Sequence, residues 1–561
     1  MSHIFPRHTK RHMPVAASGA GCCLTDTNGK RHLDASGGAA VSCLGHGDAA
    51  VIDAIKAQLD SLAYAHTGFL TSAPAEALAD LLIANAPGDL DRVYLVSGGS
   101  EATEAAIKLA RQYFVETGEP ARGHLIARRQ SYHGNTLGAL SAGGNAWRRA
   151  QFAPILLPFS HIAPCYDHRL REDGESPEAY GLRAANELEA EILRVGPETV
   201  MAFIAEPVVG ATAGAVPPAP GYFARIRQIC DRYGVLLILD EVMCGMGRTG
   251  TLFACEQDGI APDIACIAKG LGAGYQPIGA MLCSAAIYRA IENGSGRFQH
   301  GHTYLGHPAA AAGGLAAVSA ILDRGLIARV NAKGAVLADA LTARFGQHPN
   351  VGDIRGRGLF MGLEPVADRT AKAPFDPTRK LAATIKAAAF EAGLICYPMS
   401  GTIDGAKGIT PCSRPRSSSR MTRSTNWSTS SAAALTQASP RPPDRPAPRS
   451  MAAASMARLG PSSATKRPSG ADRPWSRRAA RAPSPSRRAA SHAMGAGAAR
   501  PPQALGVTTR IRPSCAALAT STPSRVKTRP RLNPRAPPAQ GLSMEYKSHS
   551  SARKSPWIHS A

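Results

Sequence analysis

Short apolar segments that alternate with helical patterns constrain the fold of this chain more than any other feature. The clearest segments lie at residues 92–99, 124–129, 200–207, 234–241 and 263–270. Each has about four to six apolar residues, which is typical of strands in a parallel sheet because helices cover both faces of such a sheet. The sequence therefore predicts a three-layer α/β fold with a mostly parallel central sheet.

A second, smaller α+β domain is expected after residue 310. A long Ala- and Leu-rich helix at about 308–345 precedes a hairpin pattern at 351–366 and a further helix at about 377–392. A hairpin pattern at 21–36 is expected to join this domain from the N-terminal end. The predicted organisation is an N-terminal segment at 1–50, a large domain at 51–310, a truncated small domain at 311–409 and a tail at 410–561.

The formal net charge of +23 comes entirely from the tail. Residues 411–561 contain 27 of the 64 Lys and Arg residues but only three of the 41 Asp and Glu residues. The rest of the chain therefore carries 37 basic and 38 acidic residues. The global charge gives no reason to expect that this near-neutral body binds a polyanion. The tail is basic, rich in Pro and poor in large apolar residues, and we predict that it is disordered.

The sequence contains no signal for export, membrane insertion or metal binding. The N-terminal residues lack the apolar region of a secretory signal, and no apolar run approaches the ~18–20 residues that span a bilayer. The twelve cysteines show no metal-ligand spacing. We expect buried, reduced thiols, a cytoplasmic location, no membrane partner and no metal.

Three polar motifs follow predicted strands. In "SGGSEATEAAIKLAR" (97–111), Gly99 and Ser100 open a helix whose start could hold a phosphate, or could form a plain glycine turn with a serine cap. Asp240 ends the most apolar strand, where an unpaired carboxylate is costly, although it could simply cap a loop. Lys269 ends another strand and could serve as an amine nucleophile or lie on the surface.

Taken together, the three motifs match the requirements of pyridoxal 5′-phosphate. An amine forms a Schiff base with this cofactor, and a carboxylate keeps the pyridine nitrogen protonated so that the ring accepts electrons. Tyr132 in "SYHGNT" follows the strand at 124–129 and supplies an aromatic ring to stack on the cofactor.

The body resembles the class III, or omega-type, pyridoxal-phosphate-dependent aminotransferases of fold type I. The order and spacing of the matching stretches hold from about residue 15 to residue 409. These stretches are "DASGGAAVSCLGHG", "SGGSEATEAAIKLAR", "SYHGNT", "EPVVGATAGAVPPAPGYF", "LDEVMCGMGRTG", "AKGLGAGYQPIGAM" and "GHTYLGHP".

The resemblance implies a ping-pong transamination from an omega-amino acid or amine to a keto acid such as pyruvate. Lys269 would be the catalytic residue, first as the Schiff-base amine and then as the general acid and base. The implied cofactor-binding residues are Gly99 and Ser100 at the phosphate, Asp240 at the pyridine nitrogen, Tyr132 and Val242 on the two ring faces, His133 and Glu206 beside them, and Thr303 at the phosphate of a neighbouring subunit. The position of Thr303 implies a homodimer.

The substrate class is inferred from one position. Family members that act on ornithine, acetylornithine or GABA carry a Glu after "EPxxG" that gates an Arg, whereas this chain has Ala211. The difference favours the omega-amino acid:pyruvate or amine:pyruvate group. Tyr64, His66 and Phe69 match a segment that lines the substrate channel in the family, but they could equally be packing residues.

Three alternatives remain open from the sequence. A pyridoxal-phosphate-dependent aminomutase, epimerase or decarboxylase would share the same motifs. The chain could also be an inactive, frameshifted product. The basic tail, with Trp427, Trp475 and Trp557, could be a disordered nucleic-acid-binding arm, although we do not expect a nucleic-acid partner.

A shift of reading frame after Gly408 gives a simpler account of the tail. The family continues here with Asp-His-x-Leu-Leu-Ala-Pro-Pro-Phe-Ile and an acidic helix. Codons that encode "GITPCSRPRSSS" (408–419) can be chosen so that one G inserted after the first codon changes the reading. The new reading is Gly-Asp-His-Ala-Leu-Leu-Ala-Pro-Pro-Phe-Ile-Ile. We therefore expect the closing strand and terminal helix of the small domain to be missing, and the chain to be unstable or inactive.

We expect resequencing of the gene across codon 408 to reveal one additional base that restores the Gly-Asp-His reading. The reason is that a single shift recovers a long run of residues typical of the family. An unchanged reading, together with clear amine:pyruvate activity of the 561-residue chain, would contradict this interpretation.

Overall fold

A seven-stranded sheet forms the centre of the computed structural model, which describes residues 2–10 and 12–413. Its order is β4 (Leu90–Val96), β10 (Gly279–Ser284), β9 (Ile264–Ile267), β8 (Leu236–Asp240), β7 (Val200–Ala205), β5 (His124–Arg128) and β6 (Ser160–Ile162). Strands β6, β5, β7, β8 and β9 run parallel, whereas β10 is antiparallel to both of its neighbours, β9 and β4. The predicted mostly parallel sheet is confirmed.

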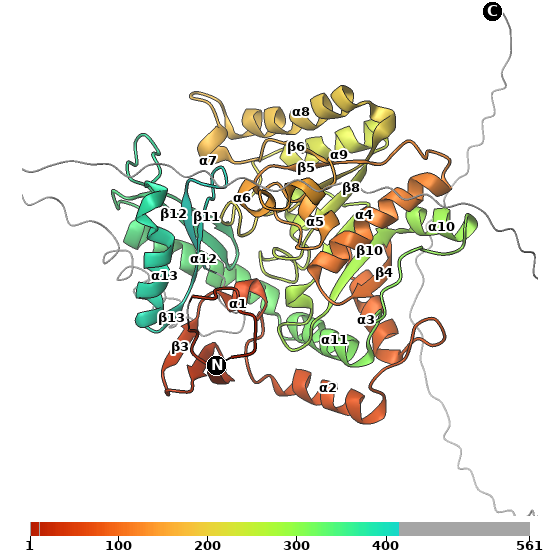
Figure 1. The fold of residues 1–561 in the computed structure, drawn as a ribbon, viewed down its shortest axis with the longest axis horizontal. Helices are drawn as coiled ribbons and strands as arrows, with labels where there is room; N and C mark the ends of the chain where they lie inside the picture. The colour runs from red at the N-terminus through yellow and green to blue at the C-terminus, as the bar shows by residue number, and fades with distance from the viewer. Residues whose placement is uncertain (1, 11, 414–561) are drawn as a thin grey trace, which may run out of the picture. The chain divides into compact units, whose positions relative to one another are not determined.

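Two helical layers cover the sheet, as predicted from its apolar strands (Figure 1). On β8, Leu237 and Leu239 belong to a core that also includes residues of α3, α8, α9 and α11. The alternate residues Leu236 and Ile238 belong to a second core with residues of α4 and α10. The helices of the two layers are α3 (Ala73–Ile83), α8 (Pro177–Val195), α9 (Tyr222–Tyr233), α11 (Pro308–Asp323), α4 (Gly99–Glu116) and α10 (Ala285–Asn293). Burial on both faces explains why these strands are apolar throughout.

Two smaller sheets contain the ends of the described chain. One has the order β1 (Ala16–Ala20), β2 (Cys23–Asp26), β3 (Arg31–Asp34) and β13 (Leu394–Ile395), and the other has the order β11 (Val351–Arg357), β12 (Phe360–Pro365), β15 (Ile409–Ser413) and β14 (Tyr397–Ser400). The predicted hairpins at 21–36 and 351–366 are confirmed as β2–β3 and β11–β12. The parallel pairing of β13 with β3 joins the N-terminal hairpin to the chain near residue 394. The domain boundaries themselves stay a prediction.

The remaining helices are α1 (Gly37–Ala40), α2 (Ala49–Ser61), α5 (Leu137–Ala142), α6 (Ala146–Arg149), α7 (Asp167–Leu170), α12 (Leu326–Phe345) and α13 (Leu381–Glu391). The single helix expected at 308–345 is wrong, because α11 ends at Asp323 and α12 begins after Gly325, whose φ is +57°. Within the described residues, no single helix is long and apolar enough to cross a membrane; only α11 and α12 taken together have the length and composition, and they are bent by 66°.

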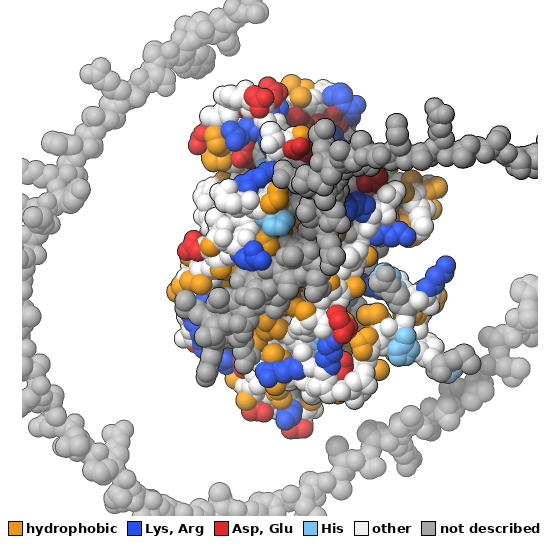
Figure 2. All heavy atoms as spheres, turned by 90° about the vertical axis from the view of Figure 1, so that its left-hand side faces the viewer, with side chains coloured by type: hydrophobic (Ala, Val, Ile, Leu, Met, Phe, Trp, Pro, Cys, Tyr) orange, Lys and Arg blue, Asp and Glu red, His pale blue; other side chains and the backbone are white. Residues whose placement is uncertain are grey.

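The surface of the described residues carries mixed charges, in keeping with the near-neutral composition of the body. Basic and acidic side chains are interspersed over the described surface on the face shown in Figure 2.

All eleven cysteines of the described residues are free and buried, as the sequence predicted. Burial raises the pKa of several of these thiols, that of Cys230 to about 12. A thiol with such a pKa stays protonated and is a poor nucleophile.

The expectation that the closing strand of the small domain is missing is wrong for residues 409–413. These residues form β15, which pairs with β14 and with β12. Strand pairing uses backbone N–H and C=O groups, so a changed sequence can still form it where the side chains can be buried. Ile409 and Cys412 lie on opposite faces of the strand and are both buried, at 6% and 0% exposure. The expected loss of the terminal helix, the predicted disordered tail and its three tryptophans lie outside the described residues.

A buried ion network ties the β11–β12 hairpin to the segment around α7. Glu364 on β12 accepts hydrogen bonds from Arg355 Nη1 at 2.7 Å, from Arg169 Nε at 2.8 Å and from the Tyr166 hydroxyl. Arg355 also donates to the Ala213 carbonyl at 2.9 Å. Burial alone would raise the pKa of Glu364, but the Arg355 guanidinium, the Tyr166 hydroxyl and Arg169 outweigh it and hold that pKa below its ordinary value.

We predict that Glu364→Gln lowers the free energy of unfolding by about 3 kcal/mol, because it removes the buried carboxylate between Arg355 and Arg169 and leaves Arg355 with the partly exposed Asp353, at 2.8 Å, as a counter-charge. The lowered pKa means that Glu364 contributes stability above its ordinary pKa of 4.5, and that this contribution is lost as the pH falls through the folded value. The free energy of unfolding of the Glu364→Gln variant should lack this part of its dependence on pH.

Urea unfolding between pH 3 and pH 7 measures both effects. Glu391→Gln is the control, because the Glu391 side chain is 85% exposed and its ion pair with Lys30 lies at the surface. Such a pair contributes about 0–1 kcal/mol. Equal losses in the two variants would contradict the role of the buried network.

Candidate active site

Eight of the nine residues predicted for the site line one cavity of about 300 Å³ at the carboxyl-terminal edge of the sheet. They follow β4, β5, β7, β8 and β9, whose carboxyl ends meet at that edge because these strands point the same way. The eight residues are Gly99, Ser100, Tyr132, His133, Glu206, Asp240, Val242 and Lys269. Thr303, the ninth, does not line this cavity.

The start of α4 forms part of the cavity wall. The first N–H groups of an α-helix have no acceptor within the helix and can bind an anion. A Cβ on Gly99 would lie 2.7 Å from Val242 Cγ1, and a Cβ on Gly134 would lie 2.9 Å from the Ser100 Cα. The Ser100 hydroxyl accepts a hydrogen bond from the Asn135 N–H at 3.1 Å. Close approach of the backbone therefore requires glycine at both positions.

Asp240 is buried and held in place by two donors. His133 Nδ1 lies 2.8 Å from Asp240 Oδ2, and the Val242 N–H donates to Oδ1 at 3.0 Å. The Asp240 and His133 side chains are 5% and 0% exposed. His133 Nε2 is buried without a hydrogen-bond partner among the described residues. The carboxylate is thus oriented at the cavity and can still meet a cationic or N–H group there.

Glu206 directly follows β7 and supports the aromatic wall of the cavity. Its carboxylate accepts hydrogen bonds from the Gly210 N–H at 3.0 Å and from the Tyr132 N–H at 3.4 Å. Burial raises the pKa of Glu206, although His133 opposes the shift. A carboxyl group with a raised pKa binds its proton more readily than a surface carboxyl, so Glu206 can act both as an acceptor and as a donor in this wall.

Lys269 follows β9 in an uncommon backbone conformation. Its φ is +48°, in the left-handed region that residues other than glycine rarely adopt. Such conformations cost free energy and persist where the surroundings impose them, often at functional sites. A Cβ on the next residue, Gly270, would lie 2.8 Å from Met246 Cβ, so only glycine fits there. The chain thus holds the amine of Lys269 at the cavity.

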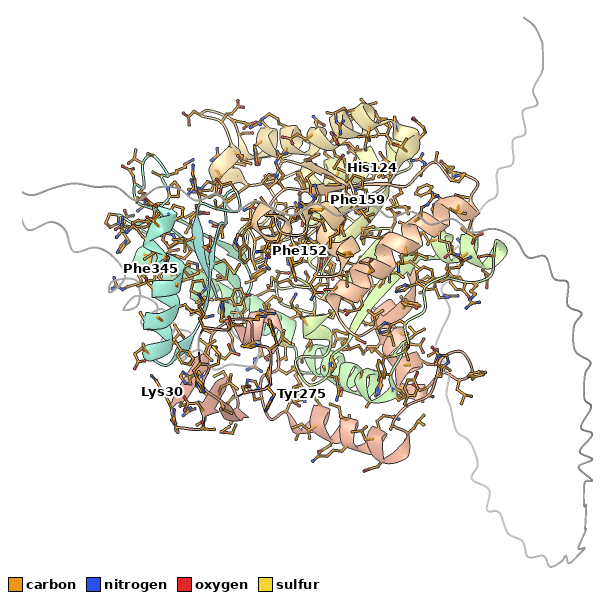
Figure 3. All side chains as sticks on the ribbon, viewed as in Figure 1. Lys30, His124, Phe152, Phe159, Tyr275 and Phe345 are labelled. Atoms are coloured by element: carbon orange, nitrogen blue, oxygen red, sulfur yellow. The ribbon has the colours of Figure 1, made fainter. Side chains whose placement is uncertain are left out.

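A tyrosine ties the loop after Lys269 to the N-terminal segment. Tyr275, labelled in Figure 3, accepts a hydrogen bond from the Asp48 N–H at 2.8 Å and donates to the Gly45 carbonyl. The nearby Val41 belongs to the lining of the cavity. The N-terminal segment and the loop after Lys269 therefore contribute to the same site.

Several residues of the site gave no signal in the sequence. Met243, Gln276 and Ile278 line the cavity, and the Arg148 guanidinium lies 4.8 Å from the centre of the Tyr132 ring. Burial raises the pKa of Tyr132, and the positive charge of Arg148 opposes this. Arg148 lies on the short helix α6 in a Gly-rich segment without periodicity, so no sequence pattern indicates its contact with Tyr132.

The residues expected at the substrate channel lie outside the cavity in the single chain. The Tyr64 hydroxyl donates to the Thr303 carbonyl at 2.7 Å. Phe69 and Tyr304 are 88% and 58% exposed. His66 contacts Phe69, with ring centres 5.9 Å apart. Tyr64, His66 and Phe69 therefore form part of an exposed aromatic surface beside Thr303, and their channel role stays a prediction.

The cavity combines an amine, a buried carboxylate, an anion-binding helix start and an aromatic wall. Comparison with known proteins places this arrangement in one family. The sequence matches the family of class III aminotransferases over residues 4–403. An uncharacterized aminotransferase of Schizosaccharomyces pombe is 44% identical over 408 residues, which are 72% of this chain and 89% of that protein.

Two further comparisons agree. A chloroplastic gamma-aminobutyrate transaminase of Solanum lycopersicum is 38% identical over 65% of this chain and 70% of its own length. The solved structure of an omega transaminase from Pseudomonas jessenii in complex with PMP has a TM-score of 0.73 and 32% identity, and covers 78% of this chain and 96% of that one. The chain belongs to the class III aminotransferases, and its fold is that of the fold type I pyridoxal-phosphate enzymes.

Proposed function

We propose that this chain binds pyridoxal 5′-phosphate and transfers an amino group from an omega-amino acid or amine to a keto acid such as pyruvate by a ping-pong reaction. The observation that carries the proposal is the convergence of Lys269, Asp240 and the start of α4 on one cavity. Membership of the class III aminotransferases supports transamination in general. The ping-pong order, the donor and the acceptor are our proposal.

The residues of the cavity fit the cofactor. The start of α4 at Gly99 and Ser100 would hold the phosphate, since the free N–H groups of a helix start bind anions and Gly99 lets this backbone pack closely against Val242 at the cavity. Asp240, oriented by His133, would face the pyridine nitrogen. Tyr132 would lie against the ring. When bound, the cofactor supplies an electron sink that stabilises negative charge on the substrate carbon.

The ε-amine of Lys269 would transfer the proton during the reaction. This amine lies in the same cavity as Asp240 and can take the proton from the carbon that carries the substrate amino group, acting as general base. The same group can return a proton as general acid. The left-handed φ of Lys269 and the absence of space beside Gly270 fix the backbone from which this side chain extends to the cavity.

The cavity wall near Ala211 favours a donor whose carboxylate does not have to be held at this position. Ala211 lines the cavity and is 8% exposed, and Met243 and Ile278 contribute further apolar surface. A small apolar residue at this position leaves room for the substrate where a Glu–Arg gate would otherwise stand. We therefore propose the omega-amino acid:pyruvate or amine:pyruvate group as the substrate class.

We further propose a homodimer in which Thr303 contacts the phosphate of the neighbouring site. The exposed aromatic residues Phe69 and Tyr304 beside Thr303 support this, because exposed apolar clusters mark protein interfaces.

We predict that Phe69→Asp shifts the chain from dimer to monomer in sedimentation velocity. Trp147→Asp is the control, since Trp147 is 71% exposed but lies on α6. A monomeric unaltered chain would rule out the dimer.

From the sequence alone an inactive chain is expected, but strand β15 forms and the cavity is complete. We therefore predict that the full chain loaded with pyridoxal 5′-phosphate converts pyruvate to alanine in proportion to the donor amine consumed. Lys269→Ala should lower this rate by about 10²–10⁴-fold, the usual contribution of a general acid–base group. Borohydride treatment followed by peptide mass spectrometry should place the pyridoxyl group on the peptide that contains Lys269.

The same assay separates the alternatives. An aminomutase, epimerase or decarboxylase would consume the amine without a keto acid and would form no alanine. Asp53→Asn, a substitution on the surface helix α2, serves as the activity control. If the unaltered chain consumes the amine without a keto acid and forms no alanine, the transaminase proposal fails and one of these alternatives takes its place; a loaded chain that consumes no amine is the inactive product.

A further inference from the structure

A buried glutamine two residues before Tyr132 links three segments that surround the cavity. Gln130 is 4% exposed. Its Nε2 donates to the Gly401 carbonyl at 2.7 Å and to the Thr212 carbonyl at 3.4 Å, and its Oε1 accepts from Asn145 Nδ2 at 3.0 Å. Both donor positions and the acceptor of the side-chain amide are therefore used.

The backbone of Gln130 is held as firmly as its side chain. Its N–H donates to the Gly144 carbonyl at 3.1 Å, and its carbonyl accepts from the Thr212 hydroxyl at 2.6 Å. The φ of Gln130 is +59°, in the left-handed region, where Gly or Asn is preferred. A glutamine in this conformation costs free energy unless its contacts compensate for it.

Each linked segment contributes to the site or to the small sheet. Gly401 opens the turn at 401–408 between β14 and β15, which is closed by a hydrogen bond from the Gly401 N–H to the Gly408 carbonyl at 2.9 Å. Thr212 follows Ala211 of the cavity wall. Asn145 caps α6 by accepting from the Arg148 N–H at 3.2 Å.

We infer that Gln130 is a positioning residue that couples the turn at 401–408 to the Tyr132 and Ala211 walls of the cavity. Gln130 itself does not line the cavity, so it acts through its neighbours. A displacement of the turn changes the acceptor at Gly401, which moves Gln130 and with it the adjoining segment that carries Tyr132. The effect on turnover rests on the proposed function, whereas the mechanical link does not.

The coupling also connects the end of the described chain with the site. Ser400 and Ile409 are paired across β14 and β15 on either side of the turn. On β15, the Thr410 hydroxyl accepts a hydrogen bond from Arg355 Nη2 at 3.2 Å, and Arg355 also donates to the Gly214 carbonyl at 3.0 Å. A change of sequence that begins at Ile409 therefore acts on the cavity walls even though every predicted cofactor residue is intact.

Hydrogen exchange of the full chain, read by mass spectrometry, tests the link. Gln130→Asn keeps a residue that tolerates positive φ but is one methylene shorter, so it loses the bond to Gly401. Peptides covering 131–134 and 401–408 should then both exchange about five- to tenfold faster, as expected for one or two lost hydrogen bonds. Gln257→Asn, which shortens an exposed glutamine bonded to the Thr249 carbonyl, should change neither peptide.

Two further measurements keep the inference falsifiable. Gln130→Glu preserves the side-chain volume but replaces the donor that faces Gly401, and it should loosen the same two peptides if the shorter variant does not fold. With cofactor-loaded enzyme that stays folded at the assay temperature, kcat/KM should fall about tenfold in both variants, whereas Gln257→Asn should leave it unchanged.

Exchange that changes in 131–134 but not in 401–408 would overturn the coupling. Loosening of both peptides with an unchanged kcat/KM would leave the mechanical link standing but would overturn the role of Gln130 as a positioning residue. If the unaltered chain shows no transamination, the proposed function fails, and the exchange of the two peptides still decides whether Gln130 links them.

Discussion

Burial of the central strands on both faces is the constraint on which the rest of this structure depends. A strand such as β8 has no polar side chain along its buried length until Asp240 at its end. Polar groups can therefore collect only beyond the strands. Because β5, β7, β8 and β9 are parallel, their carboxyl ends fall at one edge, where Glu206, Asp240 and Lys269 meet although they are far apart in the sequence.

Two buried glutamates show how the surroundings decide the character of the same side chain. Glu364 has guanidinium partners, Arg355 and Arg169, and its pKa is lowered. Glu206 has two backbone N–H donors on its carboxylate, and its pKa is raised because burial outweighs them. At neutral pH the ionised form of Glu364 is therefore favoured and pairs with the two guanidinium groups, whereas burial of Glu206 disfavours its ionised form.

The small sheet is connected to the cavity by few but buried contacts. Arg355 and Gln130 bond to backbone carbonyls of the segments that carry Ala211 and of the turn at 401–408. Strand β15 pairs with β12 and β14 in this sheet, and its residues Ile409 and Cys412 are buried on its two faces. The last described residues are thus structurally coupled to a site whose named residues all precede them.

The sequence by itself determined the fold class, because continuous apolar strands separated by helices are stable only in a three-layer arrangement. It also determined which residues meet at the site, since Gly99, Asp240 and Lys269 each end or closely follow an apolar strand, and the carboxyl ends of parallel strands lie at one edge. Only the tertiary structure decided the contacts of Arg148 and Gln130. Both lie in segments without sequence periodicity, and their partners come from other segments of the chain, so no local period or spacing encodes them.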